Sequence, residues 1–384
     1  MRAIVLGAGL QGSAAAYDLA RSAGVRSVRL ADADPERLAL ACALPGLAGC
    51  GILADLRRPE LLAAEIAGSD VCLSALPYFL NPSAALACAR AGVHYVDLGG
   101  NPEASQRILD LDPAARASGA TLVPDCGLAP GLAATVSMAA IEGFSELDAL
   151  RIRVGGLPQN PAAPLNYALS FSIHGLLNEY TGEDWVLREG RLCRLASLEE
   201  LEELELPPPL GLCEAFITRG GAGTLPASLA GRARRLDYKT IRYPGHAAQI
   251  RLLRDLGFLD EEPVDLDGLP VAPRALTARL LGRHLRSADI RDLVVFRCEA
   301  EGLLEGRRRR RRYDLLDFYD ESTGLSAMRR CTAFPASVVL QMLGRGEGPG
   351  PGAHRLEHAV APAPCLEELG RRGLRFRVEE QDLR

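Results

Sequence analysis

Residues 7–12, GAGLQG, constrain the fold of this chain more than any other stretch. They follow a short apolar run, MRAIVL, that is typical of a buried parallel strand, and they precede a segment with helical spacing. In such a turn Gly7 permits a tight bend, Gly9 lets the backbone approach a pyrophosphate, and Gly12 permits close packing of helix on strand. Strand, glycine turn and helix in this order predict a Rossmann-type unit that binds a dinucleotide.

The pattern of the first 126 residues extends this prediction. Short apolar runs alternate with helical segments of about ten residues, as in parallel βαβ units. The expected strands are 1–6, 25–31, 50–54, 70–76, 93–98 and 120–124. We therefore predict an α/β fold with a doubly wound parallel sheet over residues 1–126.

The pattern changes after residue 127. A helix is expected over 127–143 and an acidic helix or loop over 197–210. Alternating polar and apolar residues predict strands at 149–156, 293–302, 311–320 and 326–334. We predict a second α+β domain with a mostly antiparallel sheet over residues 127–334, for substrate binding and dimerisation. Residues 335–384 are expected to form a helix that returns to the Rossmann domain, followed by a tail.

Asp32 closes the second expected strand and lies 20 residues beyond Gly12. A carboxylate in this position accepts hydrogen bonds from a ribose of the dinucleotide. It also repels a 2′-phosphate, so we expect NAD as the cofactor in preference to NADP. Asp55 is expected near the adenine, or else as the N-cap of a helix. The predicted cofactor contacts are Gly7, Gly9, Leu10, Gln11, Gly12, Asp32, Asp55, Ala75, Leu76 and Pro77.

Composition argues against several other classes of protein. A net charge of −5 over 384 residues gives no reason to expect a nucleic-acid partner, and the six arginines at 307–312 are expected at a solvated hairpin tip. No stretch of 18 residues is free of both charge and proline, so no membrane span is expected. Ten cysteines without a CxxC pair predict no metal site and are typical of thiols in a reducing cytoplasm, where we expect the protein.

Two acidic residues follow later strands of the expected parallel sheet. Asp97 closes the fifth strand and Asp125 follows the sixth. Side chains in these positions face the crevice at the carboxyl edge of such a sheet. We predict a catalytic role for Asp97 and substrate binding for Asp125, although either residue can also serve only to cap a turn.

Several stretches together make the chain resemble a known family. They are VLGAGLQG, VDLGGN, PDCGLAPG, PLNYALSFSIHGLLNEYT, EAFITRGGAGTL and LDYKTIRYPGHAAQIRLL. They are similar to the saccharopine dehydrogenase-like superfamily and, within it, to lysine 6-dehydrogenases, over about residues 1–345. The resemblance implies a homodimer whose Rossmann domain binds NAD and whose second domain carries the amino-acid site and the dimer contact. The implied reaction is oxidative deamination of the lysine ε-amino group.

Lys239 is the only lysine in a chain with 44 lysines and arginines. Amine oxidation requires a group that exchanges protons near neutral pH, which a guanidinium cannot do. We therefore predict that Lys239 is catalytic, with a strand that ends near residue 240 so that Lys239 and Arg242 can share one site. The alternative is a surface lysine without a function.

Four further residues complete the predicted site. Arg242 is expected to bind a substrate carboxylate, His246 to be a second proton carrier, and Tyr167 and Ser170 to contact the amino-acid end of the substrate. Each has a structural alternative: a salt bridge for Arg242, a core position for His246, and packing for the other two.

Two other functions remain open. One is saccharopine or carboxynorspermidine dehydrogenase activity, in which a C–N bond is formed by reduction. Its larger substrate needs more cationic groups, for which Arg151, Arg153 and Arg219 are candidates. The other is a dinucleotide sensor without catalysis.

Overall fold

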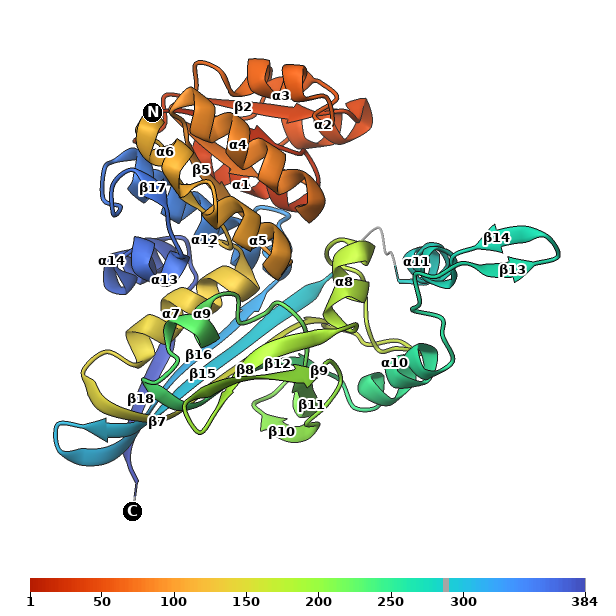
Figure 1. Cartoon of the computed structure of the whole chain (residues 1–384), viewed down its shortest axis with the longest axis vertical. Helices are drawn as coiled ribbons and strands as arrows, with labels where there is room; N and C mark the ends of the chain where they lie inside the picture. The colour runs from red at the N-terminus through yellow and green to blue at the C-terminus, as the bar shows by residue number, and fades with distance from the viewer. Residues whose placement is uncertain (286–289, 384) are drawn as a thin grey trace. The chain divides into compact units, whose positions relative to one another are not determined.

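The computed structural model in Figure 1 describes residues 1–285 and 290–383. It contains two compact units. The first comprises Met1–Ala139, Gly223–Leu225 and Arg329–Arg375. The second comprises Ala140–Ala222, Pro226–Met328 and Phe376–Arg384. The C-terminal part of the chain is thus divided between the two units.

The first unit is built on a seven-stranded sheet in the order β17-β6-β5-β4-β1-β2-β3, and all of its strand pairs are parallel. The strands are β1 Arg2–Leu6, β2 Ser27–Asp32, β3 Gly51–Leu53, β4 Val71–Ser74, β5 His94–Asp97, β6 Thr121–Val123 and β17 Gly352–Ala353. The predicted doubly wound parallel sheet is confirmed. Its strand order reverses between β1 and β4, the position at which sheets of this kind bind ligands.

Helices connect these strands, as Figure 1 shows for the red and orange part of the chain. They are α1 Leu10–Ala20, α2 Pro35–Cys42, α3 Pro59–Ile66, α4 Asn81–Ala91, α5 Pro102–Leu109 and α6 Asp112–Ser118, with a short 3₁₀ turn η1 at Tyr78–Leu80. Proline stands in the first turn of α2 to α6, where its missing N–H costs no helical hydrogen bond. The kinked turn η2 Leu128–Leu132 leads into α7 Ala133–Ala140.

The later helices α12 Ala327–Gly344, α13 Leu356–Ala359 and α14 Pro362–Arg371 follow in the C-terminal part. Asp18 of α1 joins them to the first unit, because its buried carboxylate accepts hydrogen bonds from Ser337 Oγ (2.6 Å) and Arg372 Nε (2.8 Å). The strand expected at 326–334 is wrong. Its buried residues Ala327, Cys331 and Phe334 recur with helical spacing, and they continue into the rest of α12.

The second unit is built on a nine-stranded sheet in the order β10-β11-β12-β7-β15-β16-β18, with β8 and β9 attached beside β12. Its strands are β7 Phe144–Pro158, β8 Glu183–Arg188, β9 Arg191–Ala196, β10 Glu202–Leu206, β11 Gly211–Ile217, β12 Ala233–Arg242, β15 Asp292–Leu304, β16 Arg307–Phe318 and β18 Arg377–Asp382. Among the described strands of this second sheet, only β12 and β7 pair in parallel, so the predicted mostly antiparallel sheet is confirmed.

The remaining elements of the second unit lie around this sheet. They are α8 Ile173–Glu179, α9 Leu225–Ser228, α10 His246–Asp255, α11 Pro273–His284 and the small hairpin β13 Val264–Leu266 with β14 Leu269–Val271. The acidic segment 197–210 was expected as a helix or loop, which is wrong, because it contains β10. In β10 glutamates alternate with Leu204 and Leu206 and the strand pairs with β11. Among the described residues, no helix is long and apolar enough to cross a membrane.

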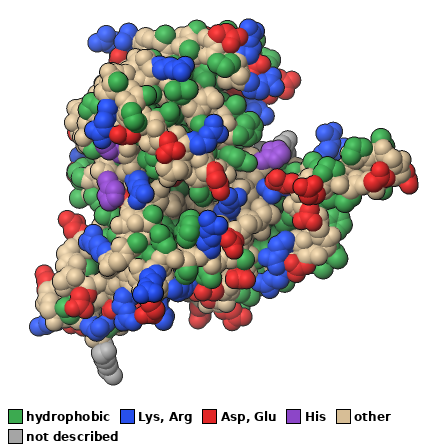
Figure 2. Space-filling model, viewed as in Figure 1, with side chains coloured by type: hydrophobic (Ala, Val, Ile, Leu, Met, Phe, Trp, Pro, Cys, Tyr) green, Lys and Arg blue, Asp and Glu red, His purple; other side chains and the backbone are tan. Residues whose placement is uncertain are grey.

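The six arginines at 307–312 lie within strand β16, and not at a hairpin tip. The turn of the β15–β16 hairpin precedes them, and β16 pairs with β15 on one side and β18 on the other. Acidic residues on both neighbours neutralise them, including Glu301 of β15 and Glu380 of β18. Figure 2 shows basic and acidic side chains intermingled on the visible surface of the protein. The predicted hairpin tip is wrong. The sequence analysis did not identify β18, whose acidic residues neutralise these arginines, because it lies about seventy residues further along the chain.

Candidate active site

The glycine turn has the geometry that its sequence predicts. Gly7 has a φ of +96°, which favours glycine, and a Cβ on Gly12 would lie 1.8 Å from the carbonyl oxygen of Gly7. No atom lies within 4 Å of a Cβ built on Gly9. The first and third glycines therefore allow α1 to pack tightly on β1, and the second leaves room for a ligand against the backbone.

The start of α1 presents unused polar groups to that space. Gly9 is the N-cap and offers no side-chain cap to the first turn of the helix. The side-chain amide of Gln11 is buried, and neither its nitrogen nor its oxygen has a hydrogen-bond partner among the described residues. Free N–H groups at a helix N-terminus bind phosphate, and a buried amide without partners is costly. Both observations fit a bound dinucleotide.

Asp32 closes β2 beside this turn, as predicted. One carboxylate oxygen accepts a hydrogen bond from the Ala8 N–H (2.6 Å) and the other accepts one from the Asp34 N–H (2.9 Å). A carboxylate has further lone pairs, which remain for ribose hydroxyls. Asp34 caps α2 and pairs with Arg37 at 3.2 Å, so the nearest cation of this segment already has an anionic partner.

The other predicted cofactor residues differ in their surroundings. The carbonyl oxygen of Ala75 lies 2.8 Å from a Cβ built on Gly7, and Leu76 also borders that turn. Pro77 directly precedes η1. The carboxylate of Asp55 instead accepts two hydrogen bonds from the Arg57 side chain, at 2.8 and 2.9 Å, which lower the pKa of Asp55. It does not cap α3, whose N-cap is Arg58.

Asp97 and Asp125 meet at the carboxyl edge of the sheet. Asp97 Oδ1 accepts hydrogen bonds from the backbone N–H groups of Gly99 (2.8 Å) and Asp125 (3.1 Å), and Oδ2 accepts one from the Tyr95 hydroxyl (3.0 Å). Asp125 has a φ of +66° and accepts a hydrogen bond from Ser105 Oγ at 2.7 Å. Burial and the neighbouring Asp97 raise the pKa of Asp125 to about 8, and burial also raises the pKa of Asp97.

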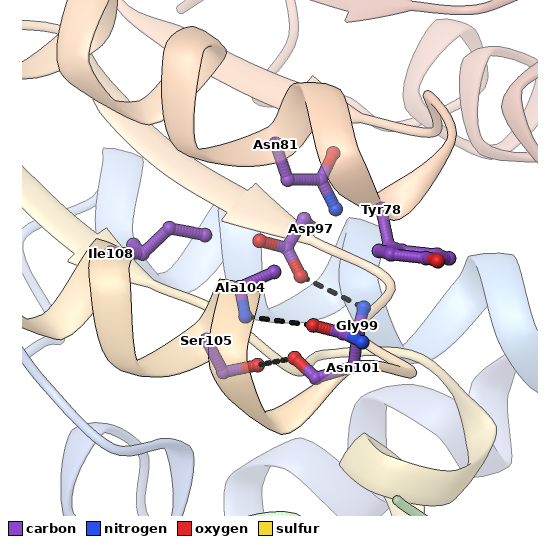
Figure 3. Close-up of a pocket in the computed structure, with 8 residues that line it drawn as sticks. All are labelled: Tyr78, Asn81, Asp97, Gly99, Asn101, Ala104, Ser105 and Ile108. Atoms are coloured by element: carbon purple, nitrogen blue, oxygen red, sulfur yellow. Dashed lines mark hydrogen bonds between the residues drawn. The ribbon is translucent and has the colours of Figure 1, made fainter. Parts of the chain in front are cut away.

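A small pocket is lined by Asp97, and Figure 3 shows the residues that form it. Its lining residues come from η1, α4, β5 and α5 and the loops between them: Tyr78, Asn81, Asp97, Gly99, Asn101, Ala104, Ser105 and Ile108. Ser105, missed by the sequence analysis, links the pocket to Asp125. Two coupled carboxylic acids at this edge can hold one proton near neutral pH and exchange it with a ligand.

A second group of predicted residues comes together inside the second unit, around Arg242. The buried guanidinium donates from Nε to the Tyr180 hydroxyl (3.1 Å) and from Nη2 to Glu179 Oε2 (3.2 Å). Its Cζ atom lies 4.8 Å from the centroid of the Tyr167 ring. Glu179 and Tyr180 were not predicted, although both stand in the stretch LLNEYT, where an acid directly follows a buried helical face.

Tyr167, whose ring borders Arg242, and Ser170, near Tyr167, carry hydroxyls without hydrogen-bond partners in the described part of the chain. Tyr167 Oη and Ser170 Oγ are buried and form no hydrogen bond among the described residues, although Ser170 is near enough to act on the pKa of Tyr167, which burial raises. An unsatisfied buried hydroxyl costs about 1–3 kcal/mol, which a ligand can recover. A guanidinium and two free hydroxyls provide donors for a carboxylate and acceptors for an amine.

His246 begins α10 and fixes Tyr180. Its Nδ1 donates to the Leu165 carbonyl (3.0 Å), which leaves Nε2 to accept from the Tyr180 hydroxyl (2.9 Å). Burial, with the nearby Arg242, lowers the pKa of His246 to about 3, so the imidazole is neutral at physiological pH. The structure thus gives His246 an orienting contact, and its part in proton transfer stays a prediction.

Lys239 belongs to a different cluster from Arg242. The expected end of the strand near residue 240 is wrong, because β12 continues to Arg242 and alternation places the two side chains on opposite faces. Lys239 Nζ donates to Glu202 Oε2 and to the Glu200 carbonyl, both at 2.7 Å. Glu202 also binds Arg153, and Arg153 lies 2.7 Å from Asp237. Lys239 is therefore part of a buried network of ion pairs.

The raised pKa of Asp125 makes the stability of the protein depend on pH. A carboxyl whose folded pKa exceeds its unfolded value loses stability as pH rises between those two values. We expect the contribution of Asp125 to the free energy of unfolding to fall between about pH 4 and pH 8, and Asp125→Asn to remove up to about 5 kcal/mol of that fall. Urea titrations across this range measure the free energy of unfolding. Asp110→Asn, at the exposed C-terminal end of α5, is the control. An equal fall in wild type and Asp125→Asn would contradict the assignment.

The chain is similar in fold and sequence to several known proteins. The yeast structure "Apo histidine-tagged saccharopine dehydrogenase (L-Glu forming) from Saccharomyces cerevisiae" has a TM-score of 0.80 at 19% identity and covers 99% of both chains, which shows a shared fold. A saccharopine dehydrogenase [NADP(+), L-glutamate-forming] of Pyricularia oryzae is 26% identical over 217 residues, 54% of this chain and 47% of that relative. The mitochondrial alpha-aminoadipic semialdehyde synthase of Bos taurus is 26% identical over 257 residues, 63% of this chain and 27% of that relative.

The chain thus spans about half or less of the length of these curated relatives. Family models account for it more fully. The saccharopine dehydrogenase NADP binding domain matches residues 3–123, which contain the glycine turn, Asp32 and Asp97. The saccharopine dehydrogenase C-terminal domain matches residues 127–374, which contain Lys239 and Arg242. Because these two models match successive parts of the chain from residue 3 to residue 374, the protein belongs to the saccharopine dehydrogenase family.

Proposed function

We propose that the chain oxidises the C–N bond of saccharopine with a nicotinamide dinucleotide. In this reaction, saccharopine, water and the oxidised dinucleotide give glutamate, an aldehyde, the reduced dinucleotide and a proton. Two relatives are named for glutamate-forming saccharopine dehydrogenases, which supports this over the lysine 6-dehydrogenase reading. The observation that carries the proposal is the buried guanidinium of Arg242 against the Tyr167 ring, with the hydroxyls of Tyr167 and the neighbouring Ser170 buried without hydrogen-bond partners among the described residues.

Each residue has a task in this scheme. Arg242 binds a substrate carboxylate, and Tyr167 and Ser170 bind the rest of that amino-acid end. Asp97, coupled to Asp125, accepts the proton that the secondary amine must lose before hydride leaves its carbon. The dinucleotide, held by the glycine turn and Asp32, supplies the hydride acceptor.

Oxidative deamination of lysine is the second candidate. Both reactions oxidise the same ε-carbon of lysine and give the same aldehyde, but lysine releases ammonia in place of glutamate. Saccharopine brings two more carboxylates, and two of the candidate cations for them are already neutralised. Arg151 pairs with Glu301 at 2.9 Å, and Arg153 pairs with Asp237 at 2.7 Å. This observation favours the smaller substrate.

Reduction of the dinucleotide with each amine separates the candidates. We expect purified protein to reduce dinucleotide with saccharopine and to release glutamate, and Arg242→Gln to raise the KM for saccharopine at least about tenfold through loss of a charged hydrogen bond. Arg151→Gln, at an already neutralised arginine, is the control. Ammonia release from lysine without turnover of saccharopine would favour lysine deamination. Turnover of carboxynorspermidine, but of neither other amine, would show that carboxynorspermidine is the substrate. Dinucleotide binding with no turnover of any amine would favour a sensor.

We further propose that NAD is the preferred cofactor, although the N-terminal family model and two relatives carry NADP in their names. Asp32 places a carboxylate beside the ribose position, and Arg37, the nearest cation on α2, is paired with Asp34. A 2′-phosphate would meet negative charge without a free partner from this segment.

Cofactor preference follows from Asp32. We expect kcat/KM for NAD to exceed that for NADP at least about tenfold, and Asp32→Asn, which keeps a hydrogen-bond acceptor but removes the charge, to narrow this ratio. Arg37→Ala is the matched variant and should leave the ratio unchanged. A wild-type preference for NADP that Arg37→Ala abolishes would assign the segment to 2′-phosphate binding.

The catalytic role of Lys239 also stays a prediction. If Lys239 exchanges protons, Lys239→Arg should bind the dinucleotide normally but turn over at least about 100-fold more slowly, because arginine keeps the charge but cannot deprotonate. Near-normal turnover, with a lowered melting temperature, would assign the residue to the Glu202 ion-pair network alone.

We also propose that the protein is a homodimer and that it is cytoplasmic. Measurement of its size in solution and fractionation of cells test these two proposals.

A further inference from the structure

Arg242 already holds an anion within the second unit. Glu179 Oε2 lies 3.2 Å from Arg242 Nη2, and the Tyr167 and Tyr180 rings border the guanidinium at 4.8 and 6.0 Å from Cζ to their centroids. The other donors of Arg242 that have partners bind the Tyr180 hydroxyl and the Ile241 carbonyl. Glu179 is therefore the carboxylate that a substrate carboxylate would meet at this arginine.

Glu179 is in an unfavourable place for an ionised acid. It is the last residue of α8, where the helix dipole and the free carbonyl groups disfavour negative charge. The contact with Arg242 offsets this by lowering the pKa of Glu179, while Arg219, a second cation beside the end of α8, donates to the Asn178 side chain (3.5 Å). Solvent nevertheless reaches 27% of the side chain, so the carboxylate can leave Arg242 and exchange protons with water.

We propose that Glu179 occupies the substrate-carboxylate position of Arg242 in the free protein and releases the arginine by taking up a proton when substrate binds. This inference rests on the proposed function, since it assigns the ligand of Arg242 as an amino-acid carboxylate. The exchange balances: the substrate carboxylate replaces one carboxylate on the guanidinium, and the displaced Glu179 becomes a neutral acid with a proton from solvent. Net charge at the buried arginine is unchanged.

Among the side chains in contact with Arg242, Glu179 is the one whose pKa lies near neutrality. Burial raises its pKa to about 7, against the opposing effect of Arg242. His246 is neutral, because burial lowers its pKa to about 3, and burial raises the pKa values of Tyr167, Tyr180 and Tyr238. Glu214 lies opposite Arg242 in the β11–β12 pairing, but its carboxylate accepts hydrogen bonds from the N–H groups of Gly245 and Ala247. Asp184, whose pKa burial raises to about 7, faces Tyr238 and not Arg242, so it supplies a control.

The sign of the effect follows from these values. Below pH 7 Glu179 is protonated and does not compete for Arg242, so substrate binds without proton uptake. Above pH 7 substrate binding must first protonate Glu179, and affinity falls by up to about tenfold per pH unit. The carboxylates of saccharopine and lysine are ionised across this range, so they add no slope.

Calorimetric titration of saccharopine and of lysine from pH 6 to pH 8.5 tests the proposal. For wild type we expect the Kd to rise above pH 7, with uptake approaching one proton per ligand when two buffers of different ionisation enthalpy are compared. Glu179→Gln should bind with a Kd that does not change with pH and that is at least about tenfold lower than wild type at pH 8.5. Asp184→Asn should keep the wild-type slope.

The outcomes separate this inference from the proposed function. Turnover of saccharopine or lysine together with a pH-independent wild-type Kd, or with a slope that survives in Glu179→Gln, would overturn the inference and leave the function standing. Absence of both binding and turnover with either amine would overturn both. If Glu179→Gln does not fold, binding by the wild type without proton uptake above pH 7 would overturn the inference, and uptake that persists in both Asp125→Asn and Asp184→Asn would support it.

Discussion

The alternation of side chains along β12 determines which residues of the second unit can act together. Because β12 stays extended from Ala233 to Arg242, Tyr238, Thr240 and Arg242 face one way and Asp237 and Lys239 face the other. One face carries a guanidinium among aromatic rings, and the other carries a network of ion pairs. The register of β12, fixed by pairing with β7 and β11, therefore separates the cluster around Arg242 from the ion-pair network of Lys239.

The local parts of the structure were predictable from sequence. The glycine turn, Asp32 and the ends of the parallel strands lie where the pattern placed them, because strand, turn and helix are encoded within about thirty residues. Asp97 and Asp125 also follow their strands as expected, and parallel strands bring their carboxyl ends to one edge of a sheet. The sequence did not predict the hydrogen bond from the Asp125 N–H to Asp97, or the one that Ser105 of α5 donates to Asp125.

The wrong or missed predictions concern segments whose structure depends on contacts with residues far away in the chain. Ala327, Cys331 and Phe334 already have helical spacing, but nine residues are too few to distinguish this period from a strand until the rest of α12 is included. The length of β12 depends on β7 and β11, which begin or end more than fifteen residues away in the chain. Glu179 and Tyr180 are recognisable as functional candidates only once Arg242, some sixty residues later, is placed beside them.

The arginine-rich strand β16 ties the second unit to residues far along the chain. The acids of β18 that neutralise it arrive only after residues 329–375, which belong to the first unit. A fragment cut at residue 328 would keep the arginines and lose these counter-charges, leaving a row of cations on an open sheet edge. The two units therefore cannot be produced as independent halves by one cut, and during synthesis the second sheet must wait for the final strand before its charge is balanced.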